Sequence, residues 1–159
     1  MGGERLRKPL LEGKFVQANP QISHDGRWIA YFSNESGQNE VYVRPFPQVD
    51  SGKWQVSSGG GREPRWSPNG RELFYRSGDA MMAVPVNTEP TFKAGAPEKL
   101  FRGAYYSSVG EMWDMSPDGK RFLMIKPEST GAAAAPEERQ SIKVVLNWLE
   151  ELKQRVPVK

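Results

Sequence analysis

The sequence predicts an all-β chain built from three copies of one antiparallel, four-stranded unit. A short turn motif occurs three times, beginning at Ser23, Ser67 and Ser116, with spacings of 44 and 49 residues. An aromatic or β-branched run of the kind that strands prefer follows each turn. The 159 residues also include 16 Gly and 13 Pro, which is typical of a chain rich in turns.

Each copy of the turn reads Ser, one variable residue, Asp or Asn, Gly, and then Arg or Lys. Glycine readily adopts a positive φ and Asp or Asn can bond its own backbone, so the motif favours a tight hairpin. Repetition at this period indicates a series of similar units. The residues with this structural role are Ser23, Asp25, Gly26, Ser67, Asn69, Gly70, Ser116, Asp118 and Gly119.

The strand after the first turn, 28–32, is apolar on both faces, which predicts a sheet covered on both sides. Radially stacked propeller blades provide such an environment. Third strands are expected at 40–44, 81–85 and 142–146, and outer fourth strands at 53–57 and 98–102. These assignments place blade 1 at 18–57, blade 2 at 62–102 and blade 3 at 111–147.

The two ends of the chain complete this organisation. Residues 1–8 form a tail, and 9–15 an orphan outer strand that resembles the later segment 99–103. The third copy has no fourth strand, because a short amphipathic helix is predicted after Asn147, its N-cap. The three blades thus span 9–147, with the helix and a tail at 148–159 and the twelfth strand at the opposite end of the chain.

The turns Ser67-Pro68-Asn69-Gly70-Arg71 and Ser116-Pro117-Asp118-Gly119-Lys120 resemble those of the TolB-like, WD-repeat-like β-propeller family. The resemblance covers roughly residues 9 to 155. It is strongest to the C-terminal propellers of some bacterial serine/threonine kinases, where a strand runs into Asn-Trp and a short helix, as at 146–152. It implies an extracytoplasmic location, although residues 1–17 show no signal peptide, and no kinase motif is present.

Three blades form half of a propeller, because closure takes about four to eight. Two chains joined head to tail would make six, the number common in the family that the chain resembles. In such a ring, residues 9–15 of each copy would complete the third blade of the other. We therefore expect a homodimer closed by reciprocal strand exchange. The alternative is a truncated half of a longer single-chain propeller.

Composition excludes several classes of site and partner. With no Cys and one His, the chain has no thiolate chemistry and no multi-His metal site. The net charge of +3 is spread along the chain, which argues against nucleic-acid binding. The sequence contains no run of 18 apolar residues, so we expect no membrane insertion. We expect neither a metal nor a cofactor.

The residues Ser23-His24-Asp25 contain a nucleophile, a base and an acid, but neighbours in a tight turn point in divergent directions. Asp25, Asn69 and Asp118 recur at one position, yet each turn supplies one ligand group where calcium needs six to eight oxygens. No Gly-x-Ser-x-Gly elbow occurs, and the glycines of 57–62 lack the Gly-Lys-Ser/Thr ending of a phosphate loop. We expect no catalytic residue and no enzymatic activity.

Propellers bind ligands at the channel mouth and at the face that carries the connections from one blade to the next. Aromatic and paired charged side chains there recognise peptides or small polar ligands. For Trp113 the favoured role is packing between blades. For Arg65 and the tyrosines, ligand recognition and a merely solvated place on the rim are equally favoured. The predicted binding residues are Gln21, Arg62, Glu63, Arg65, Tyr105, Tyr106, Glu111, Trp113 and Asp114.

The leading functional hypothesis is a non-enzymatic β-propeller module that binds a ligand or protein, as a sensor or interaction domain would. The alternative is a purely structural assembly fragment of a larger, kinase-linked propeller protein without a ligand of its own. A hydrolase or lyase activity is the least favoured hypothesis, because the chain has one His and no carboxylate cluster. The repeat alone does not choose a ligand, because a fold does not fix a function.

Overall fold

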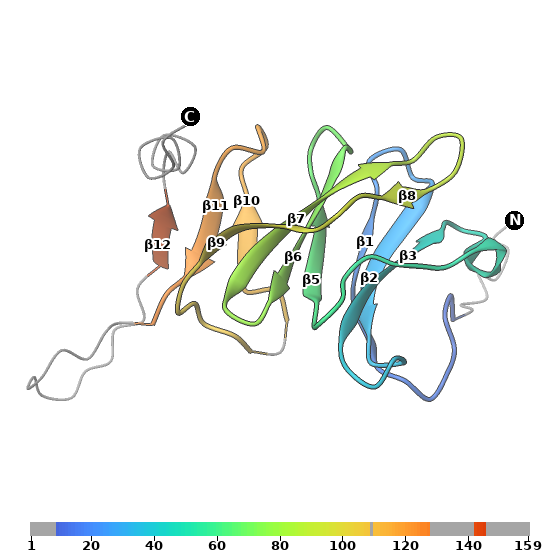
Figure 1. Ribbon diagram of the computed structural model, residues 1–159, viewed down its shortest axis with the longest axis horizontal. Helices are drawn as coiled ribbons and strands as arrows, with labels where there is room; N and C mark the ends of the chain where they lie inside the picture. Colours follow the sequence, from blue (N-terminus) through green and yellow to red (C-terminus); the bar gives the residue numbers. More distant parts are fainter. Residues whose placement is uncertain (1–8, 109, 128–141, 146–159) are drawn as a thin grey trace, which may run out of the picture.

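The structure is a computed structural model and describes residues 9–108, 110–127 and 142–145. Within these residues the chain is all-β apart from η1 (Val49–Ser51), a single 3-10 turn. Three antiparallel sheets follow one another in chain order, from blue through green to orange in Figure 1. None of the helical structure in this part of the chain is long and apolar enough to cross a membrane. The predicted C-terminal helix lies outside the described residues.

Sheet 1 contains β1 (Gln17–Ile22), β2 (Trp28–Ser33), β3 (Glu40–Pro45) and β4 (Trp54–Gln55), paired in that order. All six residues of β2 are buried, in agreement with the expectation of a strand covered on both faces. The outer strand β4 is shorter than the predicted 53–57, although the Val56 N–H still donates to the Val41 carbonyl at 2.8 Å.

Sheet 2 contains β5 (Arg62–Trp66), β6 (Glu72–Ser77), β7 (Ala80–Asn87), β8 (Lys93–Ala94) and β9 (Glu98–Arg102). Its outer edge is divided between two strands, because β9 pairs with the first half of β7 and β8 with the last two residues of β7. The strand β9 coincides with the predicted segment 98–102, whereas β8 was not predicted. Sheet 2 is thereby extended beyond a four-stranded unit.

Sheet 3 contains β10 (Trp113–Met115), β11 (Phe122–Ile125) and β12 (Ile142–Val145). The two pairs are antiparallel, with Trp113 opposite Met124 and Phe122 opposite Val145. Among the described residues, sheet 3 therefore repeats the first three strands of sheet 1. The number of blades in the complete assembly stays a prediction.

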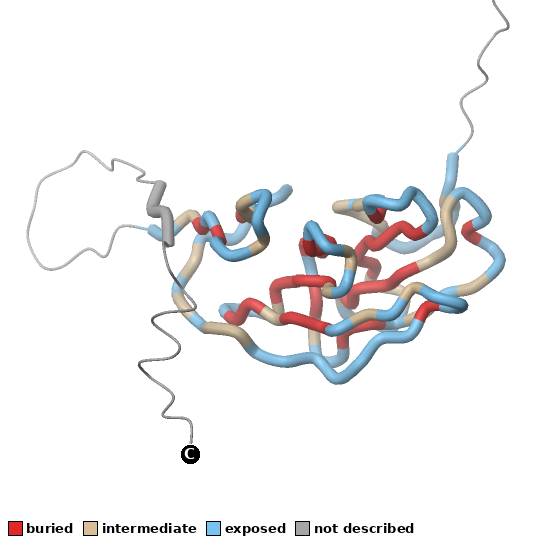
Figure 2. The backbone as a smooth tube through the Cα atoms, turned by 90° about the horizontal axis from the view of Figure 1, so that it is seen from above, coloured by how far each residue is buried: buried red, intermediate tan, exposed pale blue. Residues whose placement is uncertain are grey.

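The core lies between the sheets, where Figure 2 shows the buried segments. Leu73 and Tyr75 of β6 pack with Trp28 and Ala30 of sheet 1. Phe74, which points to the opposite face of β6, packs with Phe122 of sheet 3 at a ring distance of 5.3 Å. Alternation along a strand sends successive side chains to opposite faces, so sheet 2 contributes to both layers of the core.

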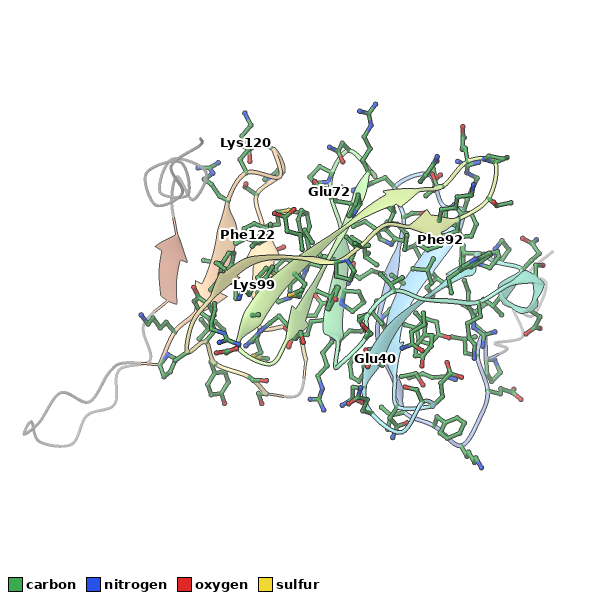
Figure 3. All side chains as sticks on the ribbon, in the orientation of Figure 1. Glu40, Glu72, Phe92, Lys99, Lys120 and Phe122 are labelled. Carbon is green, nitrogen blue, oxygen red and sulfur yellow. The ribbon has the colours of Figure 1, made fainter. Side chains whose placement is uncertain are left out.

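The hairpin that joins β7 to β8 reaches back to sheet 1 (Figure 1). Phe92 immediately precedes β8 in this hairpin, is 2% exposed and lies near β8 in Figure 3. The Phe92 ring packs 5.4 Å from that of Trp28, 5.6 Å from Trp54 and 6.4 Å from Trp66. One aromatic side chain from sheet 2 thus occupies a pocket formed largely by tryptophans of both sheets.

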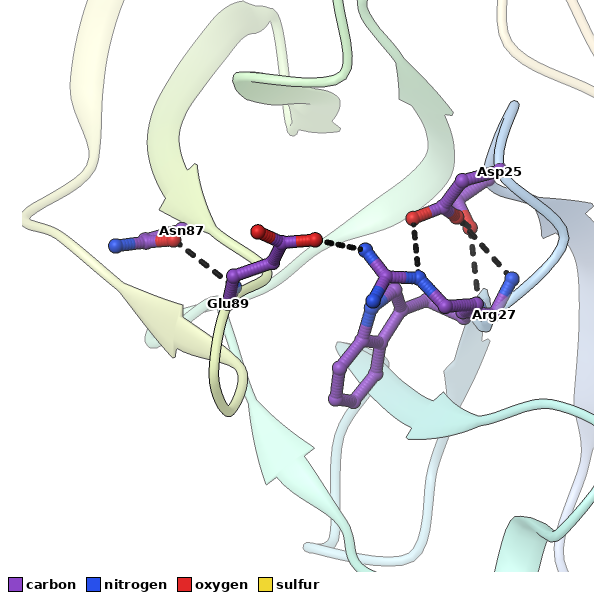
Figure 4. Close-up of polar contacts among 6 residues, drawn as sticks. Asp25, Arg27, Asn87 and Glu89 are labelled. Atoms are coloured by element: carbon purple, nitrogen blue, oxygen red, sulfur yellow. Dashed lines mark hydrogen bonds and ion pairs between the residues drawn. The ribbon is translucent and has the colours of Figure 1, made fainter.

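Charged groups join the same hairpin to the first turn (Figure 4). The Arg27 guanidinium donates through Nη2 to Glu89 Oε1 at 2.9 Å and through Nε to Asp25 Oδ2 at 2.8 Å. All three side chains are exposed, so solvent screens both ion pairs and they contribute little to the stability of the fold. The apolar contacts of Phe92 therefore dominate the attachment.

The N-terminal segment differs from its predicted conformation. Residues 9–16 contain bends and no strand, and the Val16 N–H donates to Asn34 Oδ1 at 2.9 Å. A strand needs a neighbouring edge for its hydrogen bonds, and the described part of one chain pairs no strand with residues 9–15. The pairing of this segment with a second copy stays a prediction.

The three repeated turns share one set of hydrogen bonds. In each, the Gly N–H donates to the Ser carbonyl at 2.8–2.9 Å, and the Gly has a φ of 68–71°. The Ser hydroxyl donates to Oδ1 of Asp25, Asn69 or Asp118 and accepts from the backbone N–H five residues further on. The neutral amide of Asn69 makes the same contacts as the two carboxylates, so the turn does not require a charge.

The two carboxylates give these turns a pH dependence. Burial raises the pKa of Asp25, but hydrogen bonds from Ser23 and Arg27 outweigh it and lower the pKa overall. The Ser116 hydroxyl and the Lys120 N–H lower the pKa of Asp118. Each carboxylate with a lowered pKa stabilises the folded state at pH values above its ordinary pKa of 3.8. This contribution to stability is lost as the pH falls through the lowered pKa.

We therefore expect the double variant Asp25→Asn, Asp118→Asn to lose less thermal stability than the wild type on acidification. The asparagines keep the Oδ1 acceptor, as Asn69 does, but cannot titrate. The measurement is the melting temperature by circular dichroism at about pH 5 and about pH 2.5. Equal losses in the two proteins would show that other groups control the acid response.

Candidate functional site

The candidate site is organised around β5, which has a pocket at each end. The connection pocket, of about 270 Å³, lies at the start of β5, and its described lining includes Asn39, Gly60, Arg62, Glu63, Arg76 and Ser107. The turn-side pocket, of about 300 Å³, lies at the end of β5, and its described lining includes Gln21, His24, Arg65, Trp66, Asp114 and Pro117. The predicted residues Arg62 and Arg65 thus belong to different pockets.

A bulge directs Glu63 into the interior. The register of β5 against β6 shifts between Arg62 and Arg65, and Glu63 has a φ of 52°. Asn19, at the matching place in β1, has a φ of 49°, and the register of that strand shifts in the same way. Bulges re-aim side chains, and here the bulge leaves Glu63 4% exposed at the wall of the connection pocket.

Glu63 is a buried acid with several charged groups around it. Its Oε2 accepts a hydrogen bond from the Met112 N–H at 3.0 Å. Burial raises the pKa of Glu63 above its ordinary value, Arg76 and Arg62 act to lower it, and the negative charge of Glu111 raises it further. Because burial dominates, the ionised form of Glu63 is destabilised in the folded protein.

A second buried acid, Glu40, holds residues 59–61, which we call the glycine loop, beside the connection pocket. Its Oε1 accepts hydrogen bonds from Gln38 Nε2 at 2.6 Å and from the Gly60 N–H at 2.9 Å. Its Oε2 accepts from the Ser57 hydroxyl, whose oxygen accepts in turn from the Val41 N–H at 2.7 Å. Glu40 is 1% exposed, so the loop is anchored from within the protein.

Two guanidinium groups line the connection pocket. Arg62 donates from Nε at 2.9 Å, and from Nη2, to the side-chain oxygen of Asn39, with that amide oriented to accept, and it lies 5.6 Å from the Phe32 ring centre. Arg76 donates to the carbonyls of Tyr106 at 2.7 Å and Gly78 at 3.3 Å. Every one of these acceptors is neutral.

Five predicted residues contact one another beside the inner strands. We call them the inner-strand cluster: Gln21, Arg65, Glu111, Trp113 and Asp114. Arg65 pairs with Glu111 and, through Nη1, with Asp114 Oδ1 at 3.2 Å. Gln21 Nε2 donates to Glu111 Oε1 at 2.5 Å, and the Arg65 guanidinium lies 5.5 Å from the ring centre of Trp113. The cluster ties the inner strands of the three sheets together, and its one guanidinium is paired with two carboxylates.

The predicted aromatic side chains and the residues of the first turn have different surroundings. Trp113 is 3% exposed and packs in the core between sheets 2 and 3. Tyr106 is exposed, while Tyr105 packs edge-on against Phe101 at 5.8 Å. The Ser23 hydroxyl donates to Asp25 at 2.6 Å and to no histidine, so the three turn residues 23–25 form no catalytic relay.

Sequence reasoning missed Arg76, which lines the connection pocket, and Glu40, which holds the adjoining loop. A usable signal for Arg76 existed. The repeat position of Arg76 is occupied by Phe32 in the first copy and by Ile125 in the third. A charged residue at an otherwise apolar repeat position indicates a special environment. Glu40 opens a strand of ordinary appearance and carried no such signal.

Comparisons with known proteins identify the fold and leave the family open. No family model matches the chain. An uncharacterized peptidase, YuxL, of Bacillus subtilis (strain 168) is 25% identical over an alignment of 130 residues that covers 76% of this chain. The chain spans 19% of the length of that relative.

Among solved structures, an oligogalacturonate lyase from Vibrio parahaemolyticus matches with a TM-score of 0.53 and 15% identity, over 74% of this chain and 32% of that one. A putative TolB from Agrobacterium tumefaciens matches with a TM-score of 0.49 and 19% identity, over 70% of this chain and 39% of that one. The likeness to the lyase shows that the fold is of the β-propeller type. The predicted link to kinases stays a prediction.

These comparisons contradict the expectation that the chain has no enzymatic activity. One relative is named a peptidase, and the structurally similar protein is a lyase. The expectation rested on the single His and on the absence of known catalytic motifs. These observations concern only whether residues of this chain carry out catalysis themselves. A propeller can serve an enzyme by binding its substrate, so the lack of such motifs does not remove the chain from enzymes.

Proposed function

We propose that the chain is a ligand-binding β-propeller segment of an enzyme, and that the connection pocket receives part of a peptide. The position of the pocket carries this proposal. Its lining combines Asn39 from a turn of sheet 1, Arg62 and Arg76 from sheet 2, and Ser107 from the connection toward sheet 3. Binding residues commonly gather where loops converge on a rigid scaffold.

A peptide is favoured by the relative named a peptidase and by the chemistry of the pocket. Arg62, Arg76 and the glycine loop present hydrogen-bonding groups, which suit the amides and charged ends of a peptide. Because the chain spans 19% of that relative, the peptidase activity of a complete protein belongs to the proposal as well.

A titration of the ¹⁵N-labelled chain with tri-alanine and with tri-alanine amide, followed by NMR, tests this function. We expect saturable shifts of the Gly60, Gly61 and Ser107 amide signals with at least one of the two peptides. The amides of the turn at Gly119, which lies at the other end of the sheets, serve as an internal control. An unchanged spectrum at about 10 mM of both peptides would contradict the proposed function.

Two exposed apolar residues support closure of the propeller by a second copy. Ile22 is 50% exposed, whereas Trp66, at the matching repeat position, is 6% exposed against sheet 1. Leu123 is 37% exposed, whereas its counterpart Phe74 is 4% exposed against sheet 3. Each exposed residue occupies a position that is buried where a neighbouring sheet is present, so head-to-tail pairing would cover both.

We therefore expect light scattering at micromolar concentration to give the mass of two chains. The variant Ile22→Asp, Leu123→Asp is expected to shift this mass to one chain, because it places charges in the buried interface. A matched variant with Arg71→Asp, on an exposed turn of sheet 2, is expected to remain dimeric. A folded wild-type monomer would contradict closure by a second copy.

A further inference from the structure

We propose that the connection pocket binds a carboxylate group of its ligand, which Arg62 holds at the rim and Arg76 supports from the wall. This inference rests on the proposed function, because it requires a ligand in the pocket. It adds the chemical class of the group that is recognised. The same two residues would receive the C-terminal carboxylate of a peptide or the side chain of an acidic residue.

Arg62 has both the position and the free donors for this role. It is exposed at the mouth of the pocket, and its Nε and Nη2 are directed to the oxygen of Asn39. Among the described residues, none accepts a hydrogen bond from Arg62 Nη1, and none forms an ion pair with it. A guanidinium that is already oriented loses little side-chain entropy when it binds a carboxylate.

Arg76 contributes a buried positive charge. It is 4% exposed, and its hydrogen bonds go to the carbonyls of Tyr106 and Gly78. Within the described part of the chain, no carboxylate forms an ion pair with Arg76. A buried cation without an ion-pair partner is costly, and an anionic ligand nearby reduces this cost.

Two acids lie near the pocket, and hydrogen-bond donors of the protein itself hold both of them. Both oxygens of Glu40 accept hydrogen bonds from Gln38, Ser57 and Gly60, so this carboxylate is engaged in holding the loop. Glu63 is buried in the wall and accepts from the Met112 backbone. A contrast comes from the inner-strand cluster, where Arg65 is paired with two carboxylates and is therefore less available to an anion.

The test compares tri-alanine with tri-alanine amide in calorimetric titrations of the complete chain. We expect the acid to bind at least about tenfold more tightly than the amide, because only the acid offers a charged acceptor to Arg62. N-acetyl-glutamate amide and N-acetyl-glutamine amide separate the two sources. If N-acetyl-glutamate amide binds and N-acetyl-glutamine amide does not, the site accepts acidic side chains as well as C-terminal carboxylates.

Three variants identify the residues responsible. Arg62→Gln is expected to abolish the preference for the acid, and Arg62→Lys to retain part of it. Glu63→Gln is expected to strengthen binding of the acid severalfold, because it removes a like charge from the wall. Arg71→Gln, which removes an exposed arginine elsewhere on sheet 2, is the matched control and should leave both affinities unchanged.

The outcomes separate this inference from the proposed function. Equal binding of acid and amide at the connection pocket would overturn the carboxylate site and leave peptide binding intact. The carboxylate site is also overturned if Arg62→Gln and Arg71→Gln show the same preference for the acid over the amide. Failure of both peptides to bind would overturn the two proposals together. Thermal unfolding of each variant shows whether a lost affinity reflects a lost fold.

Discussion

Replacing Phe92 with alanine is expected to lower the free energy of unfolding by about 3–5 kcal/mol, the usual effect of truncating a buried aromatic residue. The Phe92 ring contacts Trp28, Trp54 and Trp66, and these residues come from both sheets 1 and 2. The variant would leave a cavity among three large rings that cannot collapse easily. Chemical denaturation followed by tryptophan fluorescence measures the change.

Phe92→Leu is the matched control for this prediction. Leucine keeps most of the apolar volume and is expected to lower the free energy of unfolding by about 1 kcal/mol. Arg27→Gln, which removes the ion pair between the first turn and Glu89 of the hairpin, should have a much smaller effect than Phe92→Ala, because solvent screens this exposed pair. A loss of less than 1 kcal/mol in Phe92→Ala would show that the hairpin does not join sheets 1 and 2.

The second large effect is expected for Glu40→Ala, which should cost about 2–4 kcal/mol of folding stability. Glu40 is buried, and its removal would leave the donors of Ser57 and Gly60 without an acceptor inside the protein. The glycine loop would lose its anchor and the connection pocket its wall. The measurements are denaturation and the affinity for tri-alanine, both of which should fall.

Glu40→Gln separates the two oxygens of this residue. The amide oxygen can still accept from the Gly60 N–H, whereas the amide nitrogen cannot accept from the Ser57 hydroxyl. A smaller loss than in Glu40→Ala is expected, and Ser57→Ala should give a loss of similar size to Glu40→Gln. If Glu40→Ala is as stable as the wild type, the buried network does not hold the loop.

The repeat made much of the fold predictable from the sequence. The turns at Ser23, Ser67 and Ser116 depend on local hydrogen bonds and one positive φ, which a short motif records directly. The burial of β2 on both faces follows from its composition. The all-β, antiparallel architecture could therefore be read before any tertiary contact was known.

Features that depend on distant partners could not be predicted in this way. The hairpin of β7 and β8 is defined by where Phe92 packs, and its three aromatic partners lie 26–64 residues earlier in the chain. The segment 9–15 has the composition of a strand but pairs with no edge among the residues that the structure describes. Composition indicates a preference, and the available neighbour decides the structure.

The candidate site shows the same division. The residues of the inner-strand cluster were predicted because the repeat places Gln21, Arg65 and Asp114 at equivalent positions on the inner strands. The sequence did not reveal that their charges are mutually paired, since this depends on the path of residues 110–112 between sheets. It also gave no sign that Arg62 and Arg76, fourteen residues apart, line a single pocket.

A crystal structure of the chain with tri-alanine bound tests the central claim most directly. The account predicts the peptide in the connection pocket, with its carboxylate within hydrogen-bond distance of the Arg62 guanidinium and close to Arg76. The Gly59–Gly61 loop should keep its hydrogen bond to Glu40 in the complex. A peptide seated in the turn-side pocket against Arg65, or bound with its carboxylate in solvent, would contradict the account.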